Sequence, residues 1–167
     1  MRTCSHGERS RTARHFAAAA GLALGLGASV YLVAREAGSS SLPGGLGLDP
    51  WPSLTGAVPA LTFTLGFTLL AAAAWGPSRA SLACSAGAWL AVSWAFELLQ
   101  HPRVAMALLP HPAGPHTDTP FAGVTSILAR HAHLGTFDPL DLAASAAGGV
   151  LALVVGTHAL RSGAVRW

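Results

Sequence analysis

The sequence predicts an all-α polytopic membrane protein, a bundle of four transmembrane helices with a short interfacial helix in the last outer loop. Of its 167 residues, 51% are apolar and only 10% are charged, and the mean hydropathy is +0.48. Soluble domains carry roughly 25% charged residues. A spanning helix needs about 20 mostly apolar residues. Four segments meet this length, namely residues 16–34, 57–75, 82–99 and 140–160.

The first apolar segment follows a basic stretch, so it is either a signal peptide or a span. Its apolar run of about 19 residues exceeds the roughly 7 to 15 of a signal peptide, and no A-x-A cleavage site follows it. We therefore expect a span. The predicted organisation is a basic cytoplasmic tail over 1–15, one membrane domain over 16–160 and a cytoplasmic tail over 161–167.

The arginines predict the orientation of the spans, because cytoplasmic loops carry an excess of positive charge. With both termini inside, seven arginines lie on the cytoplasmic side and three on the outer side. The inner set is Arg2, Arg9, Arg11, Arg14, Arg79, Arg161 and Arg166, and the outer set is Arg35, Arg103 and Arg130. We therefore expect cytoplasmic N- and C-termini and a tight inner turn at "GPSR", residues 76–79.

Several function classes lack support in the sequence. The isoelectric point near 9.7 does not indicate a nucleic-acid partner, because the arginines form no patch outside the N-terminal tail. The two cysteines, Cys4 and Cys84, form no CxxC pattern. No GxSxG, P-loop, HExxH or dinucleotide motif occurs. We predict no cofactor and name no catalytic residue.

Small residues recur at helical spacing in two of the spans. Such residues let helices approach closely in a membrane, so we interpret them as packing seams, with a substrate groove as the alternative. The stripes are Gly21, Gly25 and Ser29 in the first span and Asp141, Ser145, Gly149, Ala152 and Gly156 in the fourth. In the last outer loop, Thr119 and Pro120 resemble a helix start, which predicts an interfacial helix over 120–131.

Acidic residues occupy the ends of two very apolar spans. Glu97 lies in the last turn of the third span and Gln100 three residues later, on the same face. Asp138 precedes Pro139 and fits an N-cap, and Asp141 falls in the first turn of the fourth span, where the helix dipole favours an anion. Glu97 lies instead near a helix C-terminus, which disfavours an anion.

The third span leaves the membrane where the fourth enters it, so these groups are expected to converge at the outer surface. Carboxylates in such a place share a proton, a cation or an arginine, and Arg103 and Arg130 lie on that side. The alternatives are a functional polar site and a structural clamp between two helices. The candidate site comprises Glu97, Gln100, Asp138, Asp141, Ser145 and Arg130.

Histidines in the outer segment raise the possibility of a metal. They are His101, His111, His116, His131 and His133. No compact ligand spacing is present, and loop histidines are usually solvated, so we predict no metal site.

The paired motifs resemble those of the VanZ-like family of bacterial membrane proteins. The pattern is E-x-x-Q at the outer end of one span, then G-x-F-D-x-x-D-x-x-x-N-x-x-G opening the next, over roughly residues 57–160. It is matched by Glu97 and Gln100, then by Gly135, Phe137, Asp138, Asp141, Ser145 and Gly148. Thr136 stands where family members often carry a basic residue, and Ser145 replaces the Asn. Either Arg130 substitutes for the missing base or the site is altered.

The resemblance implies a protein of the bacterial inner membrane whose polar site faces outward. The VanZ-like family takes its name from a protein associated with glycopeptide (teicoplanin) resistance, but its members are widespread and have no established molecular mechanism. We expect a non-enzymatic or accessory envelope role, with the lipid bilayer and an envelope precursor, a glycopeptide or another membrane protein as partners. The alternatives are a small proton- or cation-coupled transporter and an outer-surface enzyme that uses paired carboxylates.

Overall fold

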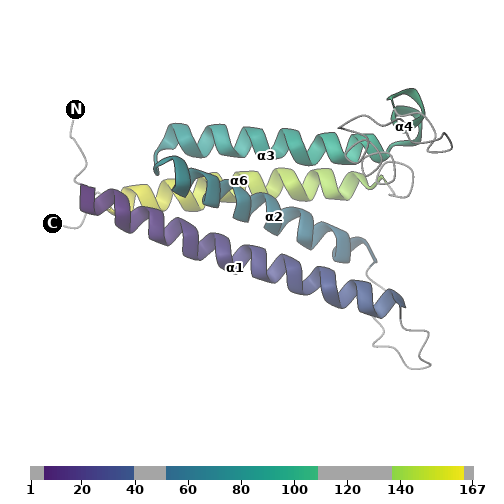
Figure 1. The fold of residues 1–167 in the computed structure, drawn as a ribbon, viewed down its shortest axis with the longest axis horizontal. Coiled ribbons are helices and arrows are strands. Elements are labelled where there is room, and N and C mark those ends of the chain that lie inside the picture. The colour runs from purple at the N-terminus through teal and green to yellow at the C-terminus, as the bar shows by residue number, and fades with distance from the viewer. Residues whose placement is uncertain (1–5, 40–51, 109–136, 164–167) are drawn as a thin grey trace, which may run out of the picture.

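The chain is a bundle of long helices (Figure 1). The computed structural model describes residues 6–39, 52–108 and 137–163, and no strand occurs within these ranges. The helices are α1 (His6–Ser39), α2 (Pro52–Trp75), α3 (Arg79–Gln100), α4 (Pro102–Leu108) and α6 (Pro139–Gly163). All but α4 are long and apolar enough to cross a membrane, which confirms the predicted all-α membrane fold.

The four long helices alternate in direction, so α1 and α6 place both chain termini at one end of the bundle (Figure 1). We call the opposite end, where α1 and α3 finish and α2 and α6 begin, the distal end. Helices α2 and α6 are central, because each contacts the other three long helices, while α1 and α3 do not touch. The distal end therefore gathers the beginning of α6 beside the end of α3.

All four long helices extend beyond the apolar runs that predicted them, and α1 and α3 show why. Helix α1 begins at His6 rather than near residue 16, so much of the predicted basic tail is helical. Helix α3 begins at Arg79 because Ser78 caps it: the Ser78 hydroxyl accepts from the Ser81 N–H at 3.0 Å, and Ser81 returns the bond. Hydropathy gives the length that the bilayer needs, whereas caps and helix propensity determine where a helix ends.

The seam predicted on α6 is confirmed, and the one predicted on α1 is wrong. On α6, Gly149 and Gly156 are buried against leucines of α3. Gly21 and Gly25 of α1 have nothing within 4 Å of an added Cβ. Helix α1 packs through another face, with Phe16, Ala20, Ala23 and Gly27 buried. Spacing identifies small residues, but the neighbouring helix determines which face is used.

The segment after α3 contains a short helix, α4, that was not predicted. It begins at Pro102, a residue type favoured at the first position of a helix. The predicted interfacial helix over 120–131 lies outside the described residues.

Candidate functional site

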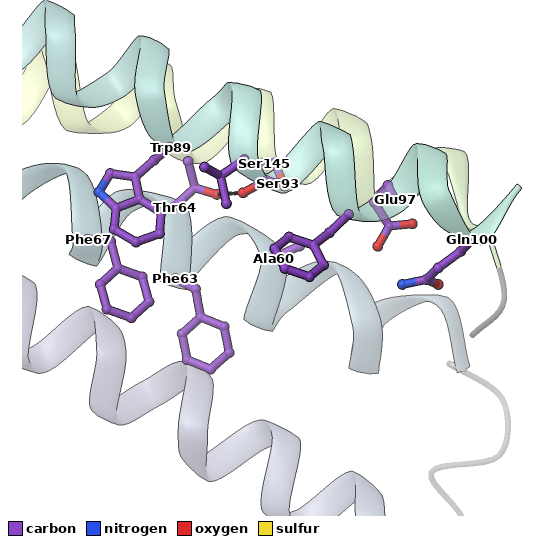
Figure 2. A pocket seen from close by; sticks show the side chains of 11 residues that line it. Ala60, Phe63, Thr64, Phe67, Trp89, Ser93, Glu97, Gln100 and Ser145 are labelled. Carbon is purple, nitrogen blue, oxygen red and sulfur yellow. Dashed lines mark hydrogen bonds between the residues drawn. The ribbon is translucent and has the colours of Figure 1, made fainter. Parts of the chain in front are cut away.

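A cavity of about 300 Å³ lies between α2 and α3 (Figure 2). Helix α3 lines it with one face, because its lining positions recur at steps of three and four residues. Those residues are Trp89, Val92, Ser93, Phe96, Glu97 and Gln100. Helix α2 supplies Ala60, Phe63, Thr64 and Phe67, and α6 supplies Ser145. Three of the six predicted site residues, Glu97, Gln100 and Ser145, therefore share one cavity.

Glu97 projects from α3 at the distal end of this cavity (Figure 2). Its Oε2 accepts a hydrogen bond from the backbone N–H of Asp138, at 3.5 Å. That N–H belongs to the beginning of α6, where the exposed N–H groups and the helix dipole favour an anion. Glu97 therefore lies at the unfavourable end of its own helix but at the favourable end of α6.

Asp138 acts as the cap of α6, as predicted. Its Oδ1 accepts from the Leu140 N–H at 2.9 Å, and its carbonyl accepts from the Asp141 N–H at 3.0 Å. An aspartate in this position satisfies N–H groups that have no partner within the helix. Asp138 does not line the cavity; it links Glu97 to the first turn of α6.

Asp141 packs against α2 rather than lining the cavity. A Cβ added at Gly56 would lie 3.1 Å from its Oδ1 and 3.3 Å from its Oδ2, so the glycine makes room for the carboxyl group. Oδ1 is buried and has no hydrogen-bond partner in the described ranges. The structure thus brings Asp141 to the distal end but directs it to the α2–α6 interface.

The three carboxyl groups are close enough to interact electrostatically. Glu97 interacts electrostatically with both Asp141 and Asp138, and Asp141 interacts in the same way with Asp138. Within the described parts of the chain, none of them forms an ion pair with an arginine. Arg103 is exposed on α4, and Arg130 lies outside the described residues. The distal end therefore gathers three carboxyl groups, whose ionised forms a cation or a hydrogen-bond donor would stabilise.

The middle of the cavity joins polar and aromatic groups from separate helices. The hydroxyls of Thr64 and Ser93 lie 3.4 Å apart in a hydrogen bond between α2 and α3 (Figure 2). The ring of Phe67 stacks on Trp89, with centroids 4.6 Å apart. The contribution of α2 was missed at the sequence level. The helical spacing of Thr64 and Phe67 in the second span could have indicated that this helix lines the cavity, but apolar spans contain many such pairs.

His101 is the one described member of the predicted histidine set. Its ring meets Phe137 edge-on, with centroids 5.2 Å apart, and its Nδ1 is buried without a described partner. The other four histidines of the outer segment lie outside the described residues. Within the described ranges, no three His, Cys, Asp or Glu side chains are placed to hold a metal ion.

The arrangement is suited to binding an elongated molecule. The amide of Gln100 and the carboxyl group of Glu97 offer polar contacts at one end, and the aromatic rings offer an apolar wall.

Comparisons with protein-family models, with curated proteins and with solved structures found no match to this chain.

Proposed function

We propose that this chain is a VanZ-like protein of the bacterial inner membrane with a non-enzymatic, accessory role in the cell envelope, of the glycopeptide-resistance type. The observation that carries the proposal is the position of Glu97. It contacts the beginning of α6 and at the same time lines the cavity between α2 and α3. The two halves of the family-like motif therefore meet at one site.

A binding role fits the cavity better than catalysis. Among the described residues that line it, Glu97 is the one titratable group. General acid–base catalysis commonly employs two positioned groups, or one group with a metal. A single carboxyl group beside an amide and an aromatic wall is suited to holding a ligand. An envelope precursor, a glycopeptide or another membrane protein is the partner class of this proposal.

The proposed orientation places the distal end outside the cell. Its support is the arginine balance, seven on the side of the termini and three on the distal side. In this orientation the site faces the compartment where glycopeptides meet envelope precursors.

The test is teicoplanin susceptibility in a susceptible bacterium that expresses the full chain. Expression is expected to raise the inhibitory concentration several-fold over the empty vector. Glu97→Gln is expected to abolish the increase at equal membrane abundance, because it removes the carboxylate and keeps the side-chain volume. Leu98→Ala is the matched control, since Leu98 is 47% exposed on the same helix and does not line the cavity.

Two results would contradict the proposal. An unchanged inhibitory concentration on expression of the wild-type chain removes the resistance role. Full resistance in Glu97→Gln at wild-type abundance removes Glu97 from the site.

A second candidate, a proton-coupled carrier, is favoured by two buried hydroxyls deeper in the bundle. Thr68 and Ser85 are fully buried, and neither hydroxyl has a hydrogen-bond partner in the described part of the chain. A proton pathway needs polar groups that continue away from Glu97. Proton flux in proteoliposomes that is lost in Ser85→Ala would support this candidate, and the absence of flux with the wild-type chain would reject it.

A further inference from the structure

The cavity is elongated along α3. Its lining residues run from Trp89 to Gln100, which at about 1.5 Å per residue corresponds to roughly 16 Å. Gln100 is the last residue of the apolar helix α3, so we expect this end to lie at the membrane boundary. The hydrocarbon core of a bilayer is about 30 Å thick. The groove therefore extends from one interface to about the middle of the bilayer, the depth of a single leaflet.

The polarity of the groove changes along this length. At the deep end, Phe67 stacks on Trp89, and Phe63 lies beside Phe67 with ring centroids 6.3 Å apart. At the boundary end, Glu97 and Gln100 project toward α2 (Figure 2). A membrane lipid has the same order of chemistry, with an apolar chain below a polar headgroup.

The size of the cavity favours a slender occupant. The cavity holds about 300 Å³. That volume is at the lower end of small-molecule sites, which occupy roughly 300–1,000 Å³. An extended hydrocarbon chain, one carbon wide, suits a groove of this small volume and elongated lining.

The carboxyl groups at the boundary end select the headgroup. Glu97 interacts electrostatically with Asp138 and Asp141, and no described arginine pairs with these carboxyl groups. An ammonium group complements this charge, whereas a headgroup whose only charge is its phosphate meets repulsion. The site therefore discriminates by the cationic part of the headgroup.

We propose that the groove between α2 and α3 holds one acyl chain of an amine-bearing phospholipid, with its ammonium group at Glu97. This inference rests on the proposed function and names a ligand class for the same site. The lipid would fill the groove in the leaflet at the distal end and bring a headgroup to the polar site.

The test uses the full-length chain reconstituted in nanodiscs of equimolar phosphatidylethanolamine and phosphatidylglycerol. After release, native mass spectrometry identifies the lipid that the protein retains. The wild-type chain is expected to retain phosphatidylethanolamine several-fold over phosphatidylglycerol. Ala60→Leu, which fills the groove, is expected to lose most of the retained lipid. Ala91→Leu is the matched control, because Ala91 is exposed on α3 and does not line the groove.

Glu97→Gln separates the headgroup from the chain. It is expected to retain lipid but to lose the preference for phosphatidylethanolamine, because an uncharged amide does not attract an ammonium group. Since this variant leaves the groove open, its result does not depend on whether Ala60→Leu folds.

Three outcomes overturn the proposal: equal retention of the two lipids by the wild-type chain, an unchanged preference in Glu97→Gln, or unchanged retention in Ala60→Leu. A wild-type dimer without lipid that dissociates in Ala60→Leu also overturns it, by assigning the groove to a second copy. The teicoplanin measurement is independent. Resistance lost in Glu97→Gln without any change in the preference for phosphatidylethanolamine rejects the lipid proposal and leaves the proposed function standing.

Discussion

At the scale of single residues, Glu97 shows how a neighbouring helix changes the electrostatics of a carboxyl group. The dipole of α3 disfavours an anion at this position, and the beginning of α6 favours one. The hydrogen bond from the Asp138 N–H places the Glu97 carboxyl group at the beginning of α6, where the dipole of α6 favours it. The position of Glu97 near the end of α3 is therefore explained by the neighbouring helix α6 and not by the sequence of α3 itself.

The cap of α6 gives a direct prediction. Asp138→Ala is expected to lower the free energy of unfolding by about 1 kcal/mol, because the Leu140 N–H loses its acceptor. Asp138→Asn keeps an acceptor oxygen and is expected to retain most of the stability. Equilibrium unfolding in mixed detergent micelles measures both variants. Equal losses for Ala and Asn would show that the charge matters rather than the cap.

A second prediction concerns close packing of α6 against α2. A Cβ at Gly148 would collide with the backbone carbonyl of Leu61, which cannot move without shifting the helix. Gly148→Ala is therefore expected to destabilise the bundle by about 1–3 kcal/mol. Gly21→Ala is the control, since its Cβ would meet open space, and it is expected to be neutral or slightly stabilising. Similar unfolding curves for the two variants would contradict the packing.

At the scale of helices, the sequence predicts what depends on local chemistry. The four spans follow from apolar length, and the Asp138 cap follows from its place before Pro139. The face predicted for α1 was wrong, and the convergence of Glu97 with the beginning of α6 was predicted without its hydrogen bond to the Asp138 N–H. Both depend on which helix lies alongside, and the order of helices in a bundle is not encoded in the periodicity of any one of them. The same limit applies to Thr64 and Phe67, whose role depends on the approach of α2 to α3.

The aromatic contact between α2 and α3 can be tested at this scale. Trp89→Ala is expected to lower the free energy of unfolding by at least about 1 kcal/mol, because stacking on Phe67 contributes roughly 0.5–1.5 kcal/mol beyond area burial. Trp89→Phe keeps a ring in place and is expected to lose less. Unfolding in mixed micelles ranks the variants. The matched control is Val154→Ala, since Val154 is 58% exposed on α6 and is expected to matter little.

At the scale of the whole molecule, the alternation of the four helices explains why the site exists. The end of α3 and the beginning of α6 must lie at the same end of the bundle, opposite the termini (Figure 1). This convergence is predictable from the number of spans. We propose that this end, with Glu97 and Gln100, faces outward across the cell membrane.

Cysteine labelling of intact cells tests this claim most directly. In a chain with Cys4 and Cys84 replaced by Ser, Gln100→Cys is predicted to react with a membrane-impermeant maleimide. Arg79→Cys, exposed at the opposite end, is predicted to react only after the cells are permeabilised. Labelling of Arg79→Cys in intact cells, with Gln100→Cys protected until lysis, would place the polar site inside and contradict the account.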